Sequence, residues 1–285
     1  MLSYRHEFHA GSFVDVHKHM TLILLLKSLL KKDAPFCYID THAGNAHYDL
    51  RSRFAQKNRE YETGISLLWH AVNTPPAVAN YLAAVKKIND VRCNQGSEPR
   101  YYPGSPAIAR QLFRAQDRMV LMELHNTEIR LLRKNFAGDH RVQIHHRDGF
   151  EGLTGLVPPV EKRGLVLIDP AYEVRNEFDR LIKSLVTAWR KWPTGIYAIW
   201  YPVQHQQPVP RFHYELRTSG IRNIFLHEFS VIPDVAVNRL SGTGMVIINP
   251  PWQFEARIRK TLEWLAPRLD RGSGIPARCE WLVPE

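Results

Sequence analysis

The sequence is short of cysteine and of long apolar runs. It has three cysteines in 285 residues, and none of them stands in a CxxC pair. An odd count without that spacing argues against a disulfide framework and against a structural zinc site. The longest apolar run, residues 20–30, is interrupted by Lys27 and falls short of the ~20 residues that cross a bilayer. We therefore expect a soluble, cytoplasmic protein outside the membrane, with residues 20–30 in a core-facing helix.

Two ligand-binding motifs are also missing. No GxGxxG occurs, and the turn at residues 40–48 has too few glycines to cradle a pyrophosphate, which disfavours a dinucleotide cofactor and an NAD-dependent oxidoreductase. None of the 14 histidines has the HExxH or Cys/His spacing that is typical of metal sites. We expect no bound metal.

Acidic residues are fewer than basic ones. Lys and Arg total 38 against 28 Asp and Glu, a formal net charge of +10. Nucleic acid is the usual counter-charge for such a chain, although a generally basic surface is the alternative. The amino-terminal stretch with Tyr4, His6 and Lys18 is both aromatic and basic, and RNA recognition combines stacking with phosphate neutralisation. We expect it to contact RNA; the alternative is that it only packs over the core.

Apolar strand-like runs alternate with helical stretches along most of the chain. They are residues 35–40, 118–124, 141–146, 164–169 and 195–202. This alternation predicts an α/β fold with a mostly parallel sheet and helices on both faces. Two later runs, 221–230 and 244–252, leave no room for a helix between them and are expected to pair antiparallel at one edge. The expected sheet has seven strands.

An excess of chain separates the first two runs. Residues 41–117 are more than the single crossover helix of a ~30-residue βαβ unit needs. We expect a helical insertion at 51–104, with helices near 61–72 and 77–90, that either braces the fold or contacts the substrate. A helix beginning near Pro106 returns to the core. The expected parts are an amino-terminal part with the first helix and strand (1–50), the insertion (51–104) and the remaining core (105–285).

Polar residues follow the first four runs where each one ends. They are Asp40-Thr41-His42-Ala43-Gly44, Glu123, Asp148-Gly149 and Asp169-Pro170-Ala171-Tyr172. Ligands of open parallel sheets bind at the carboxyl ends of the strands. A glycine-containing turn lets the backbone approach a ligand, and Glu123 is placed to accept two ribose hydroxyls. A lone acidic strand end is commonly a turn cap, but four in series favour a nucleoside cofactor without phosphates, S-adenosylmethionine.

The segment LIDPAY (167–172) predicts the chemistry. At the end of a buried strand, Asp169 supplies an acceptor, Pro170 a rigid turn and Tyr172 an aromatic face. Together they suit a planar heterocycle held by its amino edge. Asp169 and the Pro170 carbonyl would accept N–H bonds from an adenine amino group and take up developing positive charge while Tyr172 stacks on the base. A paired base cannot reach such a pocket, so the target must be unpaired or flipped out.

Several blocks of the sequence resemble the RlmJ family of 23S ribosomal RNA adenine-N6 methyltransferases, which have a class I S-adenosylmethionine-dependent fold. The blocks are residues 1–19, IDTHAG (39–44), YYPGSPAIARQL (101–112), MELH (122–125), RDGF (147–150), LIDPAYE (167–173), GIYAIWYPV (195–203) and INPPW (248–252). The resemblance implies methyl transfer to N6 of one adenine in 23S rRNA, by a protein that we expect to be a monomer. The family pattern is DPPY, and this chain has DPAY. Ala171 loses ring rigidity, while the acceptor and the aromatic ring remain.

By matching motif, the resemblance also implies a cofactor pocket. Its residues would be Lys18, His19, His42, Ser105, Glu123, Asp148, Gly149 and Asp169. Glu123 would hold the ribose, Asp148 the adenine amino group of the cofactor, and His42 with His19 the methionine end. The alternatives are that both histidines are structural, that Ser105 caps a helix and that Asp148 is an ordinary turn aspartate.

Other functions share parts of this pattern. Residues 249–252 (NPPW) also follow an apolar run, but on the last predicted strand, and we assign them a structural or rim role. A DNA adenine-N6 or a protein glutamine methyltransferase would use the same Asp/Asn-Pro-x-Tyr chemistry. A noncatalytic RNA-binding protein would explain the charge but not the series of strand-end carboxylates.

Overall fold

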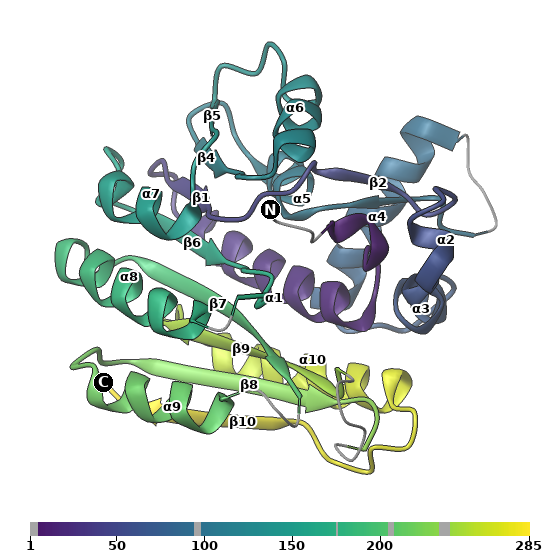
Figure 1. The fold of residues 1–285 in the computed structure, drawn as a ribbon. Helices are drawn as coiled ribbons and strands as arrows, with labels where there is room; N and C mark the ends of the chain where they lie inside the picture. The colour runs from purple at the N-terminus through teal and green to yellow at the C-terminus, as the bar shows by residue number, and fades with distance from the viewer. Residues whose placement is uncertain (1–4, 94–97, 175, 205–207, 234–239) are drawn as a thin grey trace.

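The core of the protein is one mixed sheet. A computed structural model describes residues 5–93, 98–174, 176–204, 208–233 and 240–285. The sheet strands are β1 (Cys37–Asp40), β4 (Arg118–Met122), β5 (Val142–His145), β6 (Gly164–Ile168), β7 (Ile196–Val203), β8 (Ile224–Ser230), β9 (Gly242–Ile248) and β10 (Arg278–Val283). Their order is β10-β8-β9-β7-β6-β1-β4-β5 (Figure 1). The expected α/β arrangement is confirmed.

The five alternating runs form the parallel part of the sheet. β1 lies between β4 and β6 and runs parallel to both, with Asp40 opposite Leu121 and Leu167. The chain adds strands on one side of β1 through β4 and β5, and on the other through β6 and β7. The carboxyl ends on either side of β1 therefore flank the switch point, where open sheets of this kind bind ligands.

The antiparallel edge contains one strand more than the sequence predicted. β9 lies between β7 and β8 and is antiparallel to both, as expected. The prediction of seven strands is wrong by one, because β10 pairs antiparallel with β8. β10 carries charged residues at Arg278 and Glu280 and only its Leu282 is buried, so it lacks the apolar run of the interior strands.

Helices cover both faces of the sheet, as predicted. One face carries α1 (Phe13–Leu29), α5 (Ser105–Leu112), α6 (Asn126–Asn135) and α10 (Phe254–Leu269). The other carries α7 (Gly149–Leu156), α8 (Glu177–Lys191) and α9 (Val209–Thr218). Figure 1 shows α7, α8 and α9 in front of the sheet and α1 and α10 behind it. No helix in the described ranges is long and apolar enough to cross a membrane.

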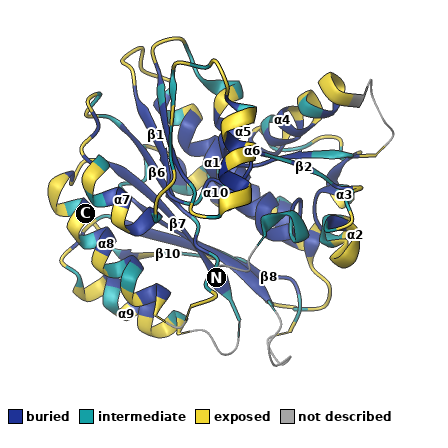
Figure 2. Cartoon of the chain, turned by 45° about the horizontal axis from the view of Figure 1, so that its top comes forward, coloured by how far each residue is buried: buried dark blue, intermediate teal, exposed yellow. Residues whose placement is uncertain are grey.

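Helix α1 lies inside the protein. Every residue from Phe13 to Leu26 is buried, whereas an outer helix such as α6 has an exposed face (Figure 2). The helix packs on β6 and β9 on one side and on α4 (Pro76–Cys93), α5 and α10 on the other, so it needs no polar face. The predicted core-facing helix is confirmed, but it begins at Phe13, which places Lys18 and His19 in the interior.

The insertion begins and ends in a two-stranded sheet. β2 (His47–Asp49) pairs with β3 (Tyr101–Pro103), and between them lie α2 (Ala55–Asn58), η2 (Glu60–Thr63), α3 (Ile65–Leu68) and α4. The predicted helix at 77–90 lies within α4. The predicted helix at 61–72 is interrupted: only η2 and α3 form in it, because Gly64 leaves helical geometry and packs so closely on Gly11 that a Cβ would lie 2.1 Å from the Gly11 carbonyl oxygen. The boundaries 51 and 104 stay a prediction.

Replacing Leu22 by alanine tests the role of α1 in the core. Leu22 is fully buried, so we expect Leu22→Ala to leave a cavity and lower the free energy of unfolding by about 3 kcal/mol. Leu67→Ala in α3 is the matched control, because 53% of Leu67 is exposed and a change of about 0.5 kcal/mol or less is expected. Urea denaturation measures both, and equal losses would contradict the buried position of α1.

Candidate active site

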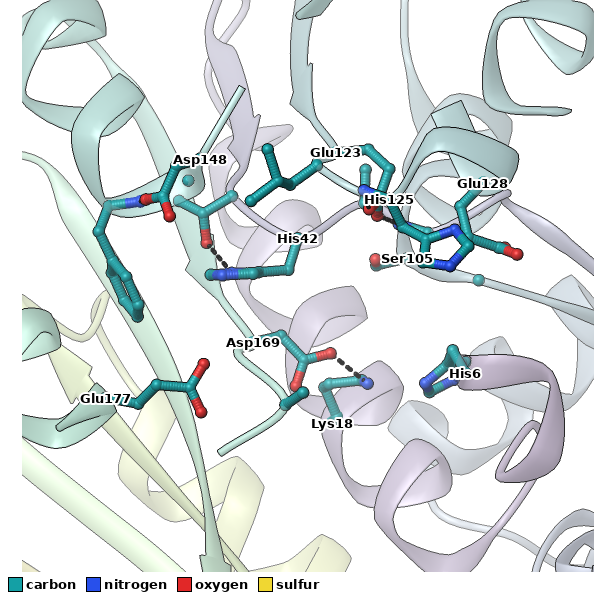
Figure 3. Close-up of a pocket in the computed structure, with 18 of the residues that line it drawn as sticks. His6, Lys18, His42, Ser105, Glu123, His125, Glu128, Asp148, Asp169 and Glu177 are labelled. Carbon is teal, nitrogen blue, oxygen red and sulfur yellow. Dashed lines mark hydrogen bonds and ion pairs between the residues drawn. The ribbon is translucent and has the colours of Figure 1, made fainter. Parts of the chain in front are cut away.

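A cavity opens at the carboxyl ends of β1, β4, β5 and β6 (Figure 3). It brings together all the residues of the predicted cofactor pocket, and His6 of the amino-terminal segment as well. These are His6, Lys18, His19, His42, Ser105, Glu123, Asp148, Gly149 and Asp169. Segments more than 150 residues apart in the sequence therefore meet at one end of the sheet, as with Lys18 and Asp169, which are 151 residues apart.

Three predicted residues are not placed in the cavity lining. Tyr4 lies outside the described residues. Pro170 and Tyr172 are not among the lining residues, although Ala171 between them is. The Tyr172 hydroxyl donates to the Trp200 carbonyl oxygen at 2.6 Å, and the Tyr172 backbone has a φ of 53°, which is rare for a bulky side chain. Stacking of Tyr172 on a base stays a prediction.

Lys18 connects two acidic groups in the cavity wall. Its ammonium group lies 2.5 Å from Asp169 Oδ2 and 3.0 Å from Asp15 Oδ1, and 3% of its side chain is exposed. Lys18 stands on α1 and Asp169 follows β6, so this contact joins the interior helix to the strand end. Among the described residues, Oδ1 of Asp169 has no hydrogen bond or ion pair, so it is available to another donor.

Asp15 is the second acidic partner of Lys18. It is fully buried, and its Oδ2 accepts hydrogen bonds from the Gly11 amide and from His6 Nε2, both at 2.9 Å. Burial alone would raise the pKa of Asp15, but His6 and Lys18 hold it well below its usual range. Asp15 is not among the site residues predicted from the sequence, although its spacing from Lys18, three residues along a helix, is a signal for such a pair.

A second carboxyl group, Asp40, is buried under the cavity floor. Its Oδ2 accepts hydrogen bonds from Tyr38 at 2.6 Å and Ser105 at 2.7 Å, and its Oδ1 accepts from the His42 amide at 3.2 Å. Burial raises the pKa of Asp40 to about 6, partly offset by these donors. The hydroxyl of Ser105 is thus bound to Asp40, and the structure shows no side-chain helix cap there.

Glu123 fixes the turn after β1. Its Oε2 accepts from the Gly44 amide at 2.8 Å and its Oε1 from the His125 amide at 2.6 Å, so the carboxylate holds the glycine-containing turn against the end of β4. Burial raises the pKa of Glu123. Glu128, which the sequence analysis missed, also lines the cavity, and its Oε2 has no hydrogen-bond partner among the described residues.

Asp148 has two structural partners. Its Oδ1 caps α7 by accepting from the Phe150 and Glu151 amides, and its Oδ2 lies 2.8 Å from Arg180. Burial acts to raise the pKa of Asp148, but the bond from Arg180 lowers it below its usual value. Gly149 is required beside it, because a Cβ there would lie 2.2 Å from the Thr41 carbonyl oxygen. Arg180 lies near the start of α8, 32 residues from Asp148 in the sequence, so no local pattern marked it.

The two predicted histidines of the cofactor pocket differ in their surroundings. His19 is buried, stacks on Tyr102 and bonds its hydroxyl through Nδ1 at 2.8 Å. Its pKa falls to about 3 through burial, and that of His42 to about 4 through burial. Both are therefore neutral at pH 7, and His42 Nδ1 bonds Thr41 Oγ1 at 2.7 Å.

The NPPW segment lies away from this cavity. Asn249 donates through Nδ2 to the carbonyl oxygens of Pro193 at 2.7 Å and Gly195 at 2.8 Å, so its amide ties the end of β9 to the start of β7. Trp252 is 83% exposed. The assignment of a structural or rim role agrees with these contacts.

Known proteins are similar to this chain over its whole length. The family model described as Ribosomal RNA large subunit methyltransferase D, RlmJ, matches residues 33–283. The chain belongs to the RlmJ family. Proteins named Ribosomal RNA large subunit methyltransferase J are similar to it over all of both chains: the one from Escherichia coli (strain K12) is 41% identical over 285 residues, and the one from Haemophilus influenzae is 42% identical over 286.

A solved structure supports the fold. The crystal structure of a protein from Legionella pneumophila str. Philadelphia 1 is 36% identical, with a TM-score of 0.87, over 96% of this chain and 98% of that one. The match to the family model begins at residue 33, so Asp15 and Lys18 lie before the matched residues of this RlmJ-family chain. The structure places both of them at the site, through the contact between Lys18 and Asp169.

The described ranges of this RlmJ-family protein contain no group of three or more His, Cys, Asp or Glu side chains that could hold a metal ion. The carboxylates of the cavity are instead bound to Lys18, Arg180, hydroxyl groups and backbone amides.

The raised pKa of Asp40 gives a pH-dependent stability. In the unfolded chain an aspartate has a pKa near 3.8, and in the folded protein burial raises the pKa of Asp40 to about 6. The folded state binds the proton more tightly than the unfolded chain does. Protonated Asp40 therefore makes its full contribution to the free energy of unfolding below the unfolded pKa of 3.8, and this contribution falls as the pH rises towards 6. The loss amounts to about 2 to 3 kcal/mol.

Asp40→Asn removes this titration. We expect the free energy of unfolding of the native protein, measured against that of Asp40→Asn, to fall between pH 4 and pH 6 and then to level off. Urea denaturation at half-unit pH intervals measures the difference. A difference that is constant over this range would contradict the buried, raised carboxyl group.

Proposed function

We propose that this protein transfers a methyl group from S-adenosylmethionine to the N6 atom of one adenine in 23S ribosomal RNA. The observation that carries the proposal is that Asp169 lies in one cavity with Glu123, held there by Lys18. Membership in a family of ribosomal RNA large subunit methyltransferases supports rRNA as the substrate. As further parts of the proposal, the enzyme acts as a monomer in the cytoplasm.

The residues of the cavity suit S-adenosylmethionine. The turn at Gly44 approaches the cavity with its backbone, and the Glu123 carboxylate beside it is suited to ribose hydroxyls. Glu128 Oε2, buried without a partner among the described residues, is a further acceptor in the same wall. When bound, S-adenosylmethionine supplies a methyl group on a positively charged sulfur, which these carboxylates suit electrostatically.

Asp148 would bind the adenine amino group of the cofactor through an oxygen that already has a partner in the protein. Its Oδ1 caps α7 and its Oδ2 pairs with Arg180. Binding of the amino group to Oδ2 would therefore lengthen the contact with Arg180 or share Oδ2 with it. The role of the neutral His19 and His42 at the methionine end rests on their place in the lining and on their low pKa values.

Asp169 would bind the target base. An adenine amino nitrogen is a weak nucleophile because its lone pair is delocalised into the ring. Lys18 takes Asp169 Oδ2, so Oδ1 is the atom that can accept an N–H of the amino group and stabilise the positive charge that develops there. Lys18 thus positions the carboxylate, and His6 with Asp15 positions Lys18. Alignment of nitrogen and methyl group supplies much of the acceleration.

A nucleoside digest tests the proposed reaction. Purified protein is incubated with labelled S-adenosylmethionine and with 23S rRNA from a strain that lacks the gene, beside 16S rRNA and duplex or single-stranded DNA of matched length. We expect label in N6-methyladenosine from 23S rRNA alone. Label in N6-methyldeoxyadenosine would favour the DNA alternative, and tight RNA binding without label would favour a noncatalytic RNA-binding protein.

Removing the Asp169 carboxylate is the matching mutational test. We expect Asp169→Ala to lower kcat by about 100-fold or more, since a positioned acceptor for developing charge is lost. Asp33→Ala removes an equal charge from a fully exposed side chain and should leave kcat unchanged. Calorimetry with S-adenosylhomocysteine checks that both variants still bind the cofactor product. Normal turnover by Asp169→Ala would contradict the proposed mechanism.

A further inference from the structure

A cluster of aromatic and cationic side chains lies beside the cavity, where η1 (His6–Phe8) packs against α2 of the insertion. We name it the Phe8–Phe54 platform, and its members are Arg5, Phe8, Arg53, Phe54 and Lys57. The two rings meet edge to face with their centroids 5.2 Å apart. Figure 1 shows the amino-terminal segment running beside the insertion.

Three cations are held on these two rings. The guanidinium carbons of Arg53 and Arg5 lie 4.7 and 5.0 Å from the centre of the Phe54 ring, and the Lys57 ammonium lies 5.7 Å from the centre of the Phe8 ring. A guanidinium group stacked on a ring keeps its N–H edge for a bidentate contact with an anion, and the stacking limits its loss of freedom on binding.

Arg5, Arg53 and Lys57 give the platform three positive charges. Within the described ranges, no ion pair joins Arg5, Arg53 or Lys57 to an acidic side chain, whereas the neighbouring Arg59 pairs with Glu62. Glu60 is close by but bonds His9 at 2.8 Å. Two guanidinium groups near one ring repel each other, and an anion bound by them would relieve that repulsion. A purely structural contact between η1 and α2 needs the rings and not three cations.

The short helix η1 contributes His6 to the cavity and Phe8 to the platform. His6, two residues before Phe8, lines the cavity, and its ring lies 5.0 Å from that of Tyr48 at the start of the insertion. A strand of nucleic acid whose base enters the cavity past His6 would therefore pass over η1 and α2.

We propose that the Phe8–Phe54 platform binds backbone phosphates of the RNA strand next to the target adenine. This proposal rests on the proposed function and adds to it the surface that receives the RNA. It assigns the insertion a substrate-binding role, through α2. The contacts are to phosphates, so they set affinity and position without reading the sequence.

The test removes charge and leaves both rings in place. The variant Arg53→Gln/Lys57→Gln loses two exposed cations of the platform. The matched control, Arg190→Gln/Lys260→Gln, loses two exposed cations from α8 and α10 that do not line the cavity. A third variant, Arg53→Lys/Lys57→Arg, exchanges the head groups and keeps both charges. Binding of 23S rRNA fragments is measured over a range of salt concentrations, together with kcat, KM and binding of S-adenosylhomocysteine.

For the platform variant we expect KM for RNA to rise by about tenfold and the slope of log affinity against log salt to shrink by about 1.4, at about 0.7 for each lost phosphate contact. Its kcat and its binding of S-adenosylhomocysteine should stay within about twofold of the native values. The control should match the native protein throughout, and the exchanged variant should keep the native salt slope.

Two outcomes separate this proposal from the proposed function. If the native protein methylates 23S rRNA and the platform variant matches the control in KM and salt slope, the platform proposal is overturned and the function stands. If the native protein methylates no RNA, the function fails, and the salt slopes of the variants still decide whether the platform binds phosphates.

Discussion

The site depends on one buried cation. The ammonium group of Lys18 lies between Asp15 and Asp169, in a position where almost no water reaches it. A buried charge that loses its partner costs about 3 to 5 kcal/mol, so each member of this set constrains the others. Asp15 is itself held by His6 and by the Gly11 amide. The contact therefore couples the amino-terminal segment, the interior helix α1 and the tip of β6, and it fixes the carboxylate on which the proposed chemistry rests.

The unusual burial of α1 follows from the same constraint. A helix that carries Asp15, Lys18 and His19 inward must satisfy each of these groups, and it does so with Asp169, Tyr102 and backbone donors. It can do so only because the insertion and α10 close over its outer side. The insertion thus has a structural task at α4 and, in the proposal made for α2, a second task in receiving RNA. Under that proposal, bracing and substrate contact belong to different elements of the insertion.

The carboxyl groups in and around the cavity differ in their surroundings. Asp15 is kept ionised by its cationic neighbours, whereas burial raises the pKa of Asp40 to about 6 and raises that of Glu123. The acidic strand ends are alike in the sequence, yet their partners differ: hydroxyls and an amide at Asp40, backbone amides at Glu123, Arg180 at Asp148 and Lys18 at Asp169.

The sequence by itself determined the parallel strands, the antiparallel pair, the helices on both faces and the cavity residues at the strand ends, because apolar periodicity and strand-end motifs are local signals. The family blocks added Lys18, His19 and Ser105. The sequence did not determine β10, in which the charged Arg278 and Glu280 interrupt the apolar residues. Nor did it determine the interruption of the helix at Gly64, which arises from close packing on Gly11. Only the tertiary structure decided that Arg180 pairs with Asp148, that the Tyr172 hydroxyl bonds Trp200 and that Lys18 holds Asp169. The physical reason is that these contacts join residues 28 to 151 positions apart, and no local pattern encodes which distant side chains the fold brings together.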